Sequence, residues 1–106
     1  MTDGRNARQR VAVVARLRPG SRERAVEIVG HGAPYELAEA GFQRHSVYLS
    51  DEVVVFVFEG TGIEALIREL VDDPARSAAF GVWGPLLQGT PAIAHEEFYW
   101  RGDAHE

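Results

Sequence analysis

The chain has 106 residues, of which 45% are hydrophobic and 25% charged, and its formal net charge at pH 7 is −5. This length suits a single domain, and the hydrophobic fraction excludes a disordered chain. The acidic balance argues against nucleic-acid binding, which requires a concentrated basic surface. The absence of cysteine excludes disulfides, thiolate metal sites and a cysteine nucleophile.

The N-terminal ten residues are polar and lack the apolar core of a secretory signal. The longest apolar run, 53–58, is much shorter than a membrane-spanning helix. We therefore expect a cytoplasmic protein with no membrane partner. Residues 1–9 are expected to form a disordered tail, 10–100 a single domain, and 101–106 a polar tail.

The first third of the chain predicts a strand followed by a helical layer. Residues 11–17 are rich in β-branched side chains and end at a Pro-Gly pair, which predicts a strand and a turn. Ser21 is placed to cap the next helix. The apolar stripe of that helix consists of Ala25, Val26, Ile28 and Val29. A Gly- and Pro-rich break precedes a second short helix expected over 35–40.

The middle of the chain predicts a β-hairpin. Residues 42–50 form its first strand, on which His45 and Val47 share a face, and 51–52 form the turn. The second strand, 53–59, is apolar on both faces and must therefore be covered twice. Helices of so small a sheet cover one face, so we expect a second subunit on the other.

The last third predicts two helical pieces and a final strand. The segment 63–70 is amphipathic at helical spacing, and Pro74 is suited to the first turn of a further helix. That further helix carries Phe80 and Trp83. The final strand is expected over 92–100.

The element order predicts an α+β protein with a ferredoxin-like β-α-β-β-α-β plait and a four-stranded antiparallel sheet. Two such sheets packed face to face form a dimeric α/β barrel, with a cavity in each subunit between sheet and helices. We therefore expect a homodimer through the sheet face and a small organic ligand in the cavity.

Histidines supply the candidate chemistry. His31 lies at a helix break, and an imidazole titrates near physiological pH, which suits general acid–base work. The alternative is an inert loop residue. His45 lies on an otherwise apolar face, either as a satisfied core residue or as part of a pocket. His45 and His95 lie on different expected strands and are candidate metal ligands, but two separate hydrogen-bonded histidines are the favoured interpretation. Glu59 ends a buried strand as either a base or a solvated group.

A family resemblance rests on three segments. The motif His-Gly-Ala-Pro-Tyr-Glu-Leu at 31–37 and the strand His-Ser-Val-Tyr-Leu at 45–49 resemble dimeric α/β-barrel proteins of the rhamnose mutarotase kind. The sequence Glu-Glu-Phe-Tyr at 96–99 is similar to a Glu-Val-Phe-Tyr near the end of that family. The resemblance implies a proton donor at His31 and a sugar-contacting residue at His45, where the family has tyrosine. Small monooxygenases and polyketide-tailoring proteins resemble this fold too.

The leading hypothesis is a small enzyme of mutarotase, isomerase or monooxygenase type, without a tightly bound cofactor or metal. In it His31 is the catalytic acid–base group, and the cavity is shaped by His45, Tyr35, Phe80 and Trp83. The alternative is a non-catalytic small-molecule-binding or interaction module of a biosynthetic pathway, which the lack of a second clear catalytic group favours.

Overall fold

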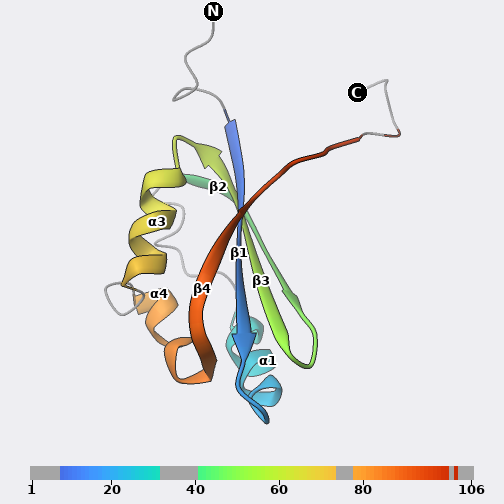
Figure 1. Cartoon of the computed structure of the whole chain (residues 1–106), viewed down its shortest axis with the longest axis vertical. Helices are drawn as coiled ribbons and strands as arrows, with labels where there is room; N and C mark the ends of the chain where they lie inside the picture. The colour runs from blue at the N-terminus through green and yellow to red at the C-terminus, as the bar shows by residue number, and fades with distance from the viewer. Residues whose placement is uncertain (1–7, 32–40, 74–77, 101, 103–106) are drawn as a thin grey trace, which may run out of the picture.

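The computed structural model describes residues 8–31, 41–73, 78–100 and 102 (Figure 1). Its four strands are β1 (Arg8–Leu17), β2 (Phe42–Leu49), β3 (Val53–Thr61) and β4 (Leu87–His95). The helices are α1 (Arg22–Gly30), α3 (Glu64–Asp72), α4 (Ala78–Gly81) and the short 3-10 helix η3 (Gly84–Leu86). The strands form one antiparallel sheet in the order β2-β3-β1-β4. The predicted plait is therefore confirmed, with β1 and β3 at its centre.

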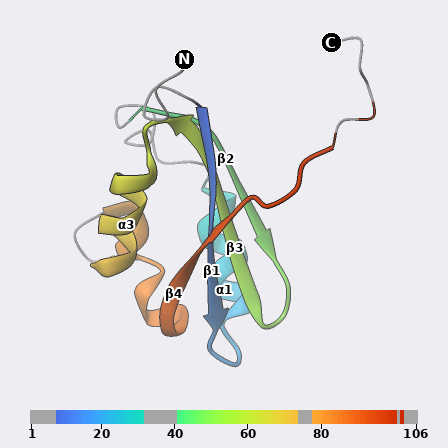
Figure 2. The ribbon, with the colours of Figure 1, turned by 45° about the horizontal axis from the view of Figure 1, so that its top comes forward.

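The helices cover one face of the sheet, as Figures 1 and 2 show. Side chains of a strand alternate between the two faces, so burial identifies the covered side. On the two central strands the fully covered set is Val11, Val13, Ala15, Leu17, Val54, Phe56 and Phe58. On the helices, Ala25 and Ile67 are completely buried against this side. The hydrophobic core thus lies between the sheet and the helices.

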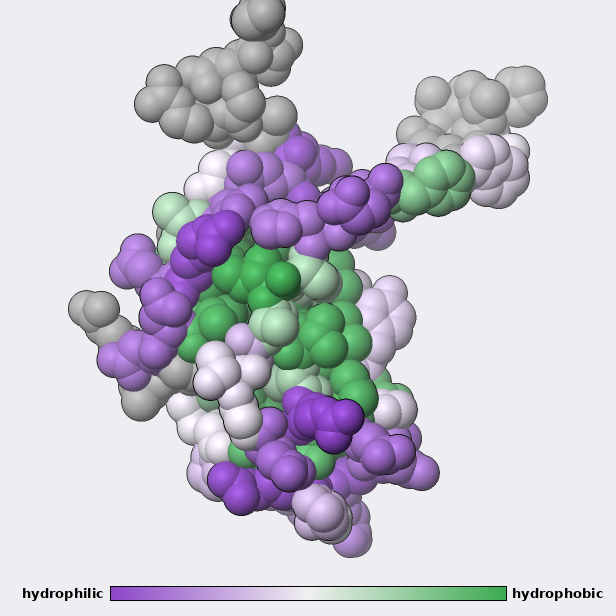
Figure 3. All heavy atoms as spheres, viewed as in Figure 1, coloured by the Kyte–Doolittle hydropathy of each residue, from purple (hydrophilic) through white to green (hydrophobic). Residues whose placement is uncertain are grey.

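The other face of the sheet is open, and we call its apolar residues the open face. They are Ala12, Val14, Tyr48, Val53, Val55, Val57, Ala92 and Ala94. Val14 pairs with Val55 and Ala12 with Val57 across β1 and β3. The three valines that β3 contributes to the open face are half-buried. Figure 3 shows this hydrophobic surface over the strands, framed by hydrophilic residues. The prediction that β3 is apolar on both faces holds, and the helices that the structure describes cover only one of these faces.

The β2–β3 hairpin turns at Asp51 and Glu52, as expected. Ser50 stabilises the turn, because its Oγ accepts hydrogen bonds from the backbone N–H groups of Glu52 and Val53 at 3.2 and 3.0 Å. Its own backbone N–H donates to the carbonyl of Val53 at 2.9 Å.

Helix α1 departs from its predicted pattern. Ser21 occupies the N-cap position, but its hydroxyl makes no capping hydrogen bond. Ala25 is buried, whereas Val26 and Val29 are 47% and 39% exposed, so the four-residue stripe is only partly used. The second short helix expected over 35–40 lies outside the described residues.

The last strand was predicted too late in the chain. Gly89, Thr90 and Pro91, which precede the predicted start, form a bulge inside β4. Gln88 pairs with Arg16 and Ala92 with Val14, so three residues of β4 stand opposite one residue of β1. Bulges and edge strands are the positions in a sheet that accept proline. The strand therefore starts at Leu87 and ends at His95, and residues 96–100 lie outside it.

None of the helices within the described ranges is long and apolar enough to cross a membrane.

Candidate functional site

An aromatic cluster lies between the sheet and the helices. The rings of Phe56 and Phe58 project from β3, and Phe80 packs on both at centroid distances of 5.0 and 6.1 Å. Trp83 meets Phe56 edge-on at 4.9 Å, and Phe42 lies 5.1 Å from Phe58. All five are less than a tenth exposed. Such contacts fix ring positions beyond what area burial requires.

His45 lies at the edge of this cluster. It is on β2, and its half-buried ring stacks on Phe58 at a centroid distance of 4.6 Å and an interplanar angle of 23°. Val47 and Leu49, on the same face of β2, are also half-buried. The helices thus cover β2 less completely than the central strands.

The hydrogen bond of His45 defines its tautomer. Its Nδ1 lies 3.2 Å from the backbone oxygen of Val57, which can only accept, so Nδ1 carries the proton. Burial lowers the pKa of His45, and the bond to Val57 opposes this shift less strongly. The ring is therefore neutral at physiological pH. Its Nε2 carries a lone pair to which no other described residue makes a hydrogen bond.

The structure brings together three of the predicted site residues. Phe58 contacts both His45 and Phe80, and Trp83 joins them through Phe56. His31 is exposed at the C-cap of α1, where its backbone N–H donates to the carbonyl of Ile28 at 3.2 Å. Its imidazole makes no hydrogen bond with another described residue. Tyr35 lies outside the described residues.

His45 and His95 do not converge. His45 pairs with Phe58, Phe58 with Val11, and Val11 with His95, so the four residues form one row across the whole sheet. Three strand spacings separate the two histidines, or about 14 Å. The part of the chain that the structure describes contains no cluster of three or more metal-binding side chains.

His95 instead contacts the first turn of α3. Its Nε2 lies 3.1 Å from Oε2 of Glu64, and Arg68 donates to the same oxygen at 2.9 Å. The hydrogen bond with His95 and then that with Arg68 lower the pKa of Glu64. This cluster ties the β4 edge of the sheet to α3.

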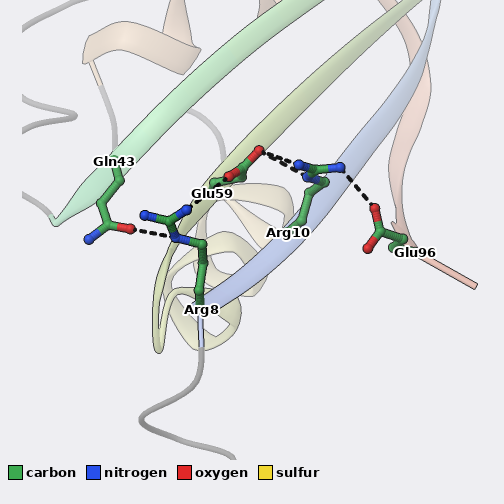
Figure 4. A network of polar contacts seen from close by, with 5 residues as sticks. All are labelled: Arg8, Arg10, Gln43, Glu59 and Glu96. Atoms are coloured by element: carbon green, nitrogen blue, oxygen red, sulfur yellow. Dashed lines mark hydrogen bonds and ion pairs between the residues drawn. The ribbon is translucent and has the colours of Figure 1, made fainter. Parts of the chain in front are cut away.

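A polar network crosses one end of the sheet (Figure 4). Arg10 donates from Nε to Glu59 at 2.9 Å and from Nη1 to Glu96 at 3.0 Å. Arg8 donates to Gln43 at 3.0 Å and places Nη1 4.0 Å from Glu59. The side chain of Glu59 is only 9% exposed, so it is neither the solvated group nor the free base considered from the sequence.

The network has a clear electrostatic consequence. Burial lowers the pKa of Arg10, but the charges and hydrogen bonds of Glu59 and Glu96 outweigh this and raise it. An open hollow of about 180 Å³ lies here, lined by Arg8, Gln9, Arg10, Glu59, Glu96 and Tyr99. In the sequence, this network is visible only as charged residues at one end of each of two strands. Predicting that these residues meet requires the strand register, which a single sequence does not provide.

Comparisons with known proteins bear on the fold. No family model matches the sequence, and no curated protein matches it. The tetracenomycin F2 cyclase of Streptomyces glaucescens, a type-II polyketide cyclase, superposes with a TM-score of 0.64 at 16% identity over 89% of this chain and 98% of its own. A dimeric ferredoxin-like protein from an uncultured marine organism gives 0.56 at 17%, over 88% and 98%. Rv0793 of Mycobacterium tuberculosis gives 0.56 at 16%, over 92% and 100%.

The chain has a ferredoxin-like fold. The resemblance to ferredoxin-like α/β proteins is thereby confirmed as a statement about the fold. These identities do not extend the likeness to chemistry. The mutarotase-like roles of His31 and His45 stay predictions.

Proposed function

We propose that this protein is a small-molecule enzyme that acts between the sheet and the helices, with His45 as its general base. The observation that carries the proposal is the neutral His45 ring, which holds its proton at Nδ1 and leaves Nε2 free beside an aromatic wall. A general base must be unprotonated and within reach of the proton that it removes. Desolvation supplies the first condition, because burial lowers the pKa of the imidazole.

The aromatic wall favours a flat, partly aromatic substrate. Phe58 already stacks on the imidazole, and Phe80 packs on Phe58, so a planar ligand beside them would extend an existing stack. An acidic hydroxyl or enol on that ligand would donate to Nε2 of His45. A type-II polyketide cyclase among the similar structures supports the same substrate class. His31 as proton donor and Tyr35 as a cavity residue are part of the proposal.

Binding of 2-naphthol, a planar probe with one acidic hydroxyl, tests the site. Long-range ¹H–¹⁵N NMR spectra of the imidazoles are expected to show His45 in the Nδ1–H form, with Nε2 shifting as the probe binds. His45→Ala is expected to weaken binding, whereas His95→Ala, at the opposite end of the same row, serves as the matched control. Equal affinity of wild type and His45→Ala would end the proposal for His45.

A separate variant tests His31. If it donates a proton, His31→Ala lowers turnover while 2-naphthol binding is retained, because its exposed imidazole makes no ring contact or hydrogen bond with the described residues of the aromatic wall. Unchanged turnover would remove His31 from the mechanism without affecting the assignment of His45.

A non-catalytic binding module is the second candidate. It is favoured by one observation: no carboxylate of the described residues contacts His45. Native mass spectrometry of freshly purified protein would identify a retained molecule. Conversion of that molecule by wild type but not by His45→Ala supports the enzyme, and a molecule that is bound but never converted supports the module.

We further propose that two copies pair through the open face. This face carries half-buried valines that the chain's own helices leave uncovered, and large apolar patches mark interaction surfaces. Val55→Arg, at its centre, is expected to give a monomer in light-scattering measurements. Val26→Arg, at an exposed valine of α1, is the control and is expected to leave the dimer intact. A wild-type monomer at micromolar concentration would contradict the proposal.

A further inference from the structure

The segment that follows β4 exposes three consecutive aromatic residues. Phe98, Tyr99 and Trp100 are 83%, 54% and 74% exposed, and we call 96–100 the C-terminal arm. Figures 1 and 2 show the arm extending away from the sheet and the helices. Phe98 and Trp100 are the more exposed two of the three and form an apolar surface. Exposed apolar surfaces of this kind mark interfaces, in which aromatic residues are enriched.

The root of the arm nevertheless keeps polar contacts with the sheet. Glu96 accepts a hydrogen bond from Arg10 at 3.0 Å, and the Arg10 guanidinium lies 5.3 Å from the ring centre of Tyr99. Arg10 is in turn bound to the buried Glu59 of β3. The direction in which the arm leaves is therefore determined by an ion-pair network on the sheet.

The two aromatic residues that flank Tyr99 are more exposed than Tyr99 itself. Phe98 is 83% and Trp100 74% exposed, whereas Tyr99 lies beside Arg10. Most of the surface of these two rings is therefore open to a partner, and the arm presents a two-ring apolar surface.

The arm is continuous with the open face. Arg10 and Glu59 pair in register directly beyond the pair Ala12 and Val57, so they stand at one end of the same face. Figure 3 shows the hydrophilic root of the arm at the rim of the hydrophobic surface. A molecule that packs on the open face therefore meets the arm as well.

We propose that the C-terminal arm reaches across to a second copy of this chain, which covers Phe98 and Trp100, and that Arg10 positions it. This inference rests on the proposed function for the identity of the partner. A second copy brings an identical apolar face and an identical arm, so each copy supplies both the surface and the reaching segment. Such a two-fold arrangement is self-complementary.

Fluorine NMR of protein labelled with 5-fluorotryptophan tests the arm directly. The chain has two tryptophans, Trp83 and Trp100, and Trp83→Phe assigns their signals. In a dilution series through the monomer–dimer transition, the Trp100 signal is expected to lose its sensitivity to D₂O as dimer forms. The buried Trp83 is the internal control and is expected to stay insensitive throughout.

Variants measure the contribution of the arm. The double variant Phe98→Ser and Trp100→Ser is expected to weaken dimerisation about tenfold or more, since aromatic anchors dominate interface energies. Val26→Ser, also at an exposed apolar residue, is the matched control. Arg10→Gln is expected to weaken dimerisation while the far-ultraviolet circular dichroism stays unchanged, and Arg10→Lys to restore part of it.

The outcomes separate this inference from the proposed dimer. A dimer in which Trp100 stays fully sensitive to D₂O contradicts the proposal for the C-terminal arm but not the proposal that two copies pair through the open face. A protein that is monomeric at every concentration overturns both. A dimer with protected Trp100 that tolerates Val55→Arg supports the arm and overturns the sheet-face interface. If Trp100 is protected only when a different protein binds, and no dimer forms, the proposal for the C-terminal arm is also wrong.

Discussion

The imidazole of His45 lies flat against the ring of Phe58, with their centroids 4.6 Å apart. This contact removes much of the water from one face of the imidazole, and burial is the main reason why its pKa is lowered. The same stack thus links the fold of the hairpin to the protonation state of the residue that we propose as a base.

The lowered pKa of His45 predicts an acid-sensitive stability. The unfolded chain binds a proton at His45 near pH 6.5, whereas the folded chain does so only at lower pH, so the unfolded state binds more protons below 6.5. The free energy of unfolding should therefore fall as the pH drops below 6.5. Urea unfolding at pH 7.5 and 5.5, at one protein concentration, is expected to show a smaller fall for His45→Gln. His31→Gln is the control, and identical pH dependence in both variants would contradict the assignment.

The buried carboxylate of Glu59 predicts an asymmetry between the two partners of Arg10. The Glu59 side chain is 9% exposed and that of Glu96 37%. Glu59→Gln leaves the guanidinium without its main partner and is expected to lower the free energy of unfolding by roughly 1–2 kcal/mol, because solvent reaches Arg10 and offsets part of the loss. Glu96→Gln is expected to change it by less than about 0.5 kcal/mol. Urea titrations at pH 7 measure both, and equal effects would argue against the network as described.

The Glu64 cluster predicts a titration experiment. His95 is the first cause of the lowered pKa of Glu64 and Arg68 the second. His95→Gln is therefore expected to raise the pKa of Glu64 more than Arg68→Gln does, as followed by the ¹³C shift of its carboxyl carbon. A carboxylate with a lowered pKa stabilises the fold above its unfolded value of 4.5, and this contribution is lost as the pH falls below that value. The reverse order of the two variants would show that Arg68 dominates.

Gly60 predicts a packing penalty. A Cβ at this position would lie 2.7 Å from Cγ2 of Ile63 and 2.9 Å from the backbone oxygen of Gly41. Gly60→Ala is therefore expected to lower the free energy of unfolding by roughly 1–3 kcal/mol, because the backbone oxygen cannot move aside alone. Gly30→Ala, in α1 with nothing within 4 Å of the added methyl, is expected to raise it by about 0.5–1 kcal/mol. Chemical denaturation of the two variants side by side checks both values.

The central strands were predictable because their pattern is strong and local. The β-branched run at 11–17 and the apolar run at 53–59 specify strands whatever surrounds them. The start of β4 was not predictable, because Gly89 and Pro91 have the composition of a turn. Only pairing with β1 shows that they form a bulge. Tertiary pairing here outweighed a local signal that is normally reliable.

The candidate site, like the fold, was predicted only where the local sequence pattern was sufficient. The alternation of β2 placed His45 on the same face as Val47, and Phe80 and Trp83 were expected to shape the same cavity. The helix predicted to carry both aromatics ends at Gly81, and Trp83 lies at the N-cap of η3. The ion pair between Arg10 and Glu59 joins residues 49 positions apart, and its partners are determined by a strand register that one sequence does not encode visibly.

The bulge in β4 also affects what the sheet's outer edge can recruit. An edge strand offers unpaired backbone groups to any passing extended chain, which is the usual starting point of fibrous aggregation. Pro91 removes one N–H from that template, and the bulge at Gly89 interrupts its regular spacing. β4 is therefore a poor template for the addition of further strands, and an assembly of limited size forms more easily than an open-ended one.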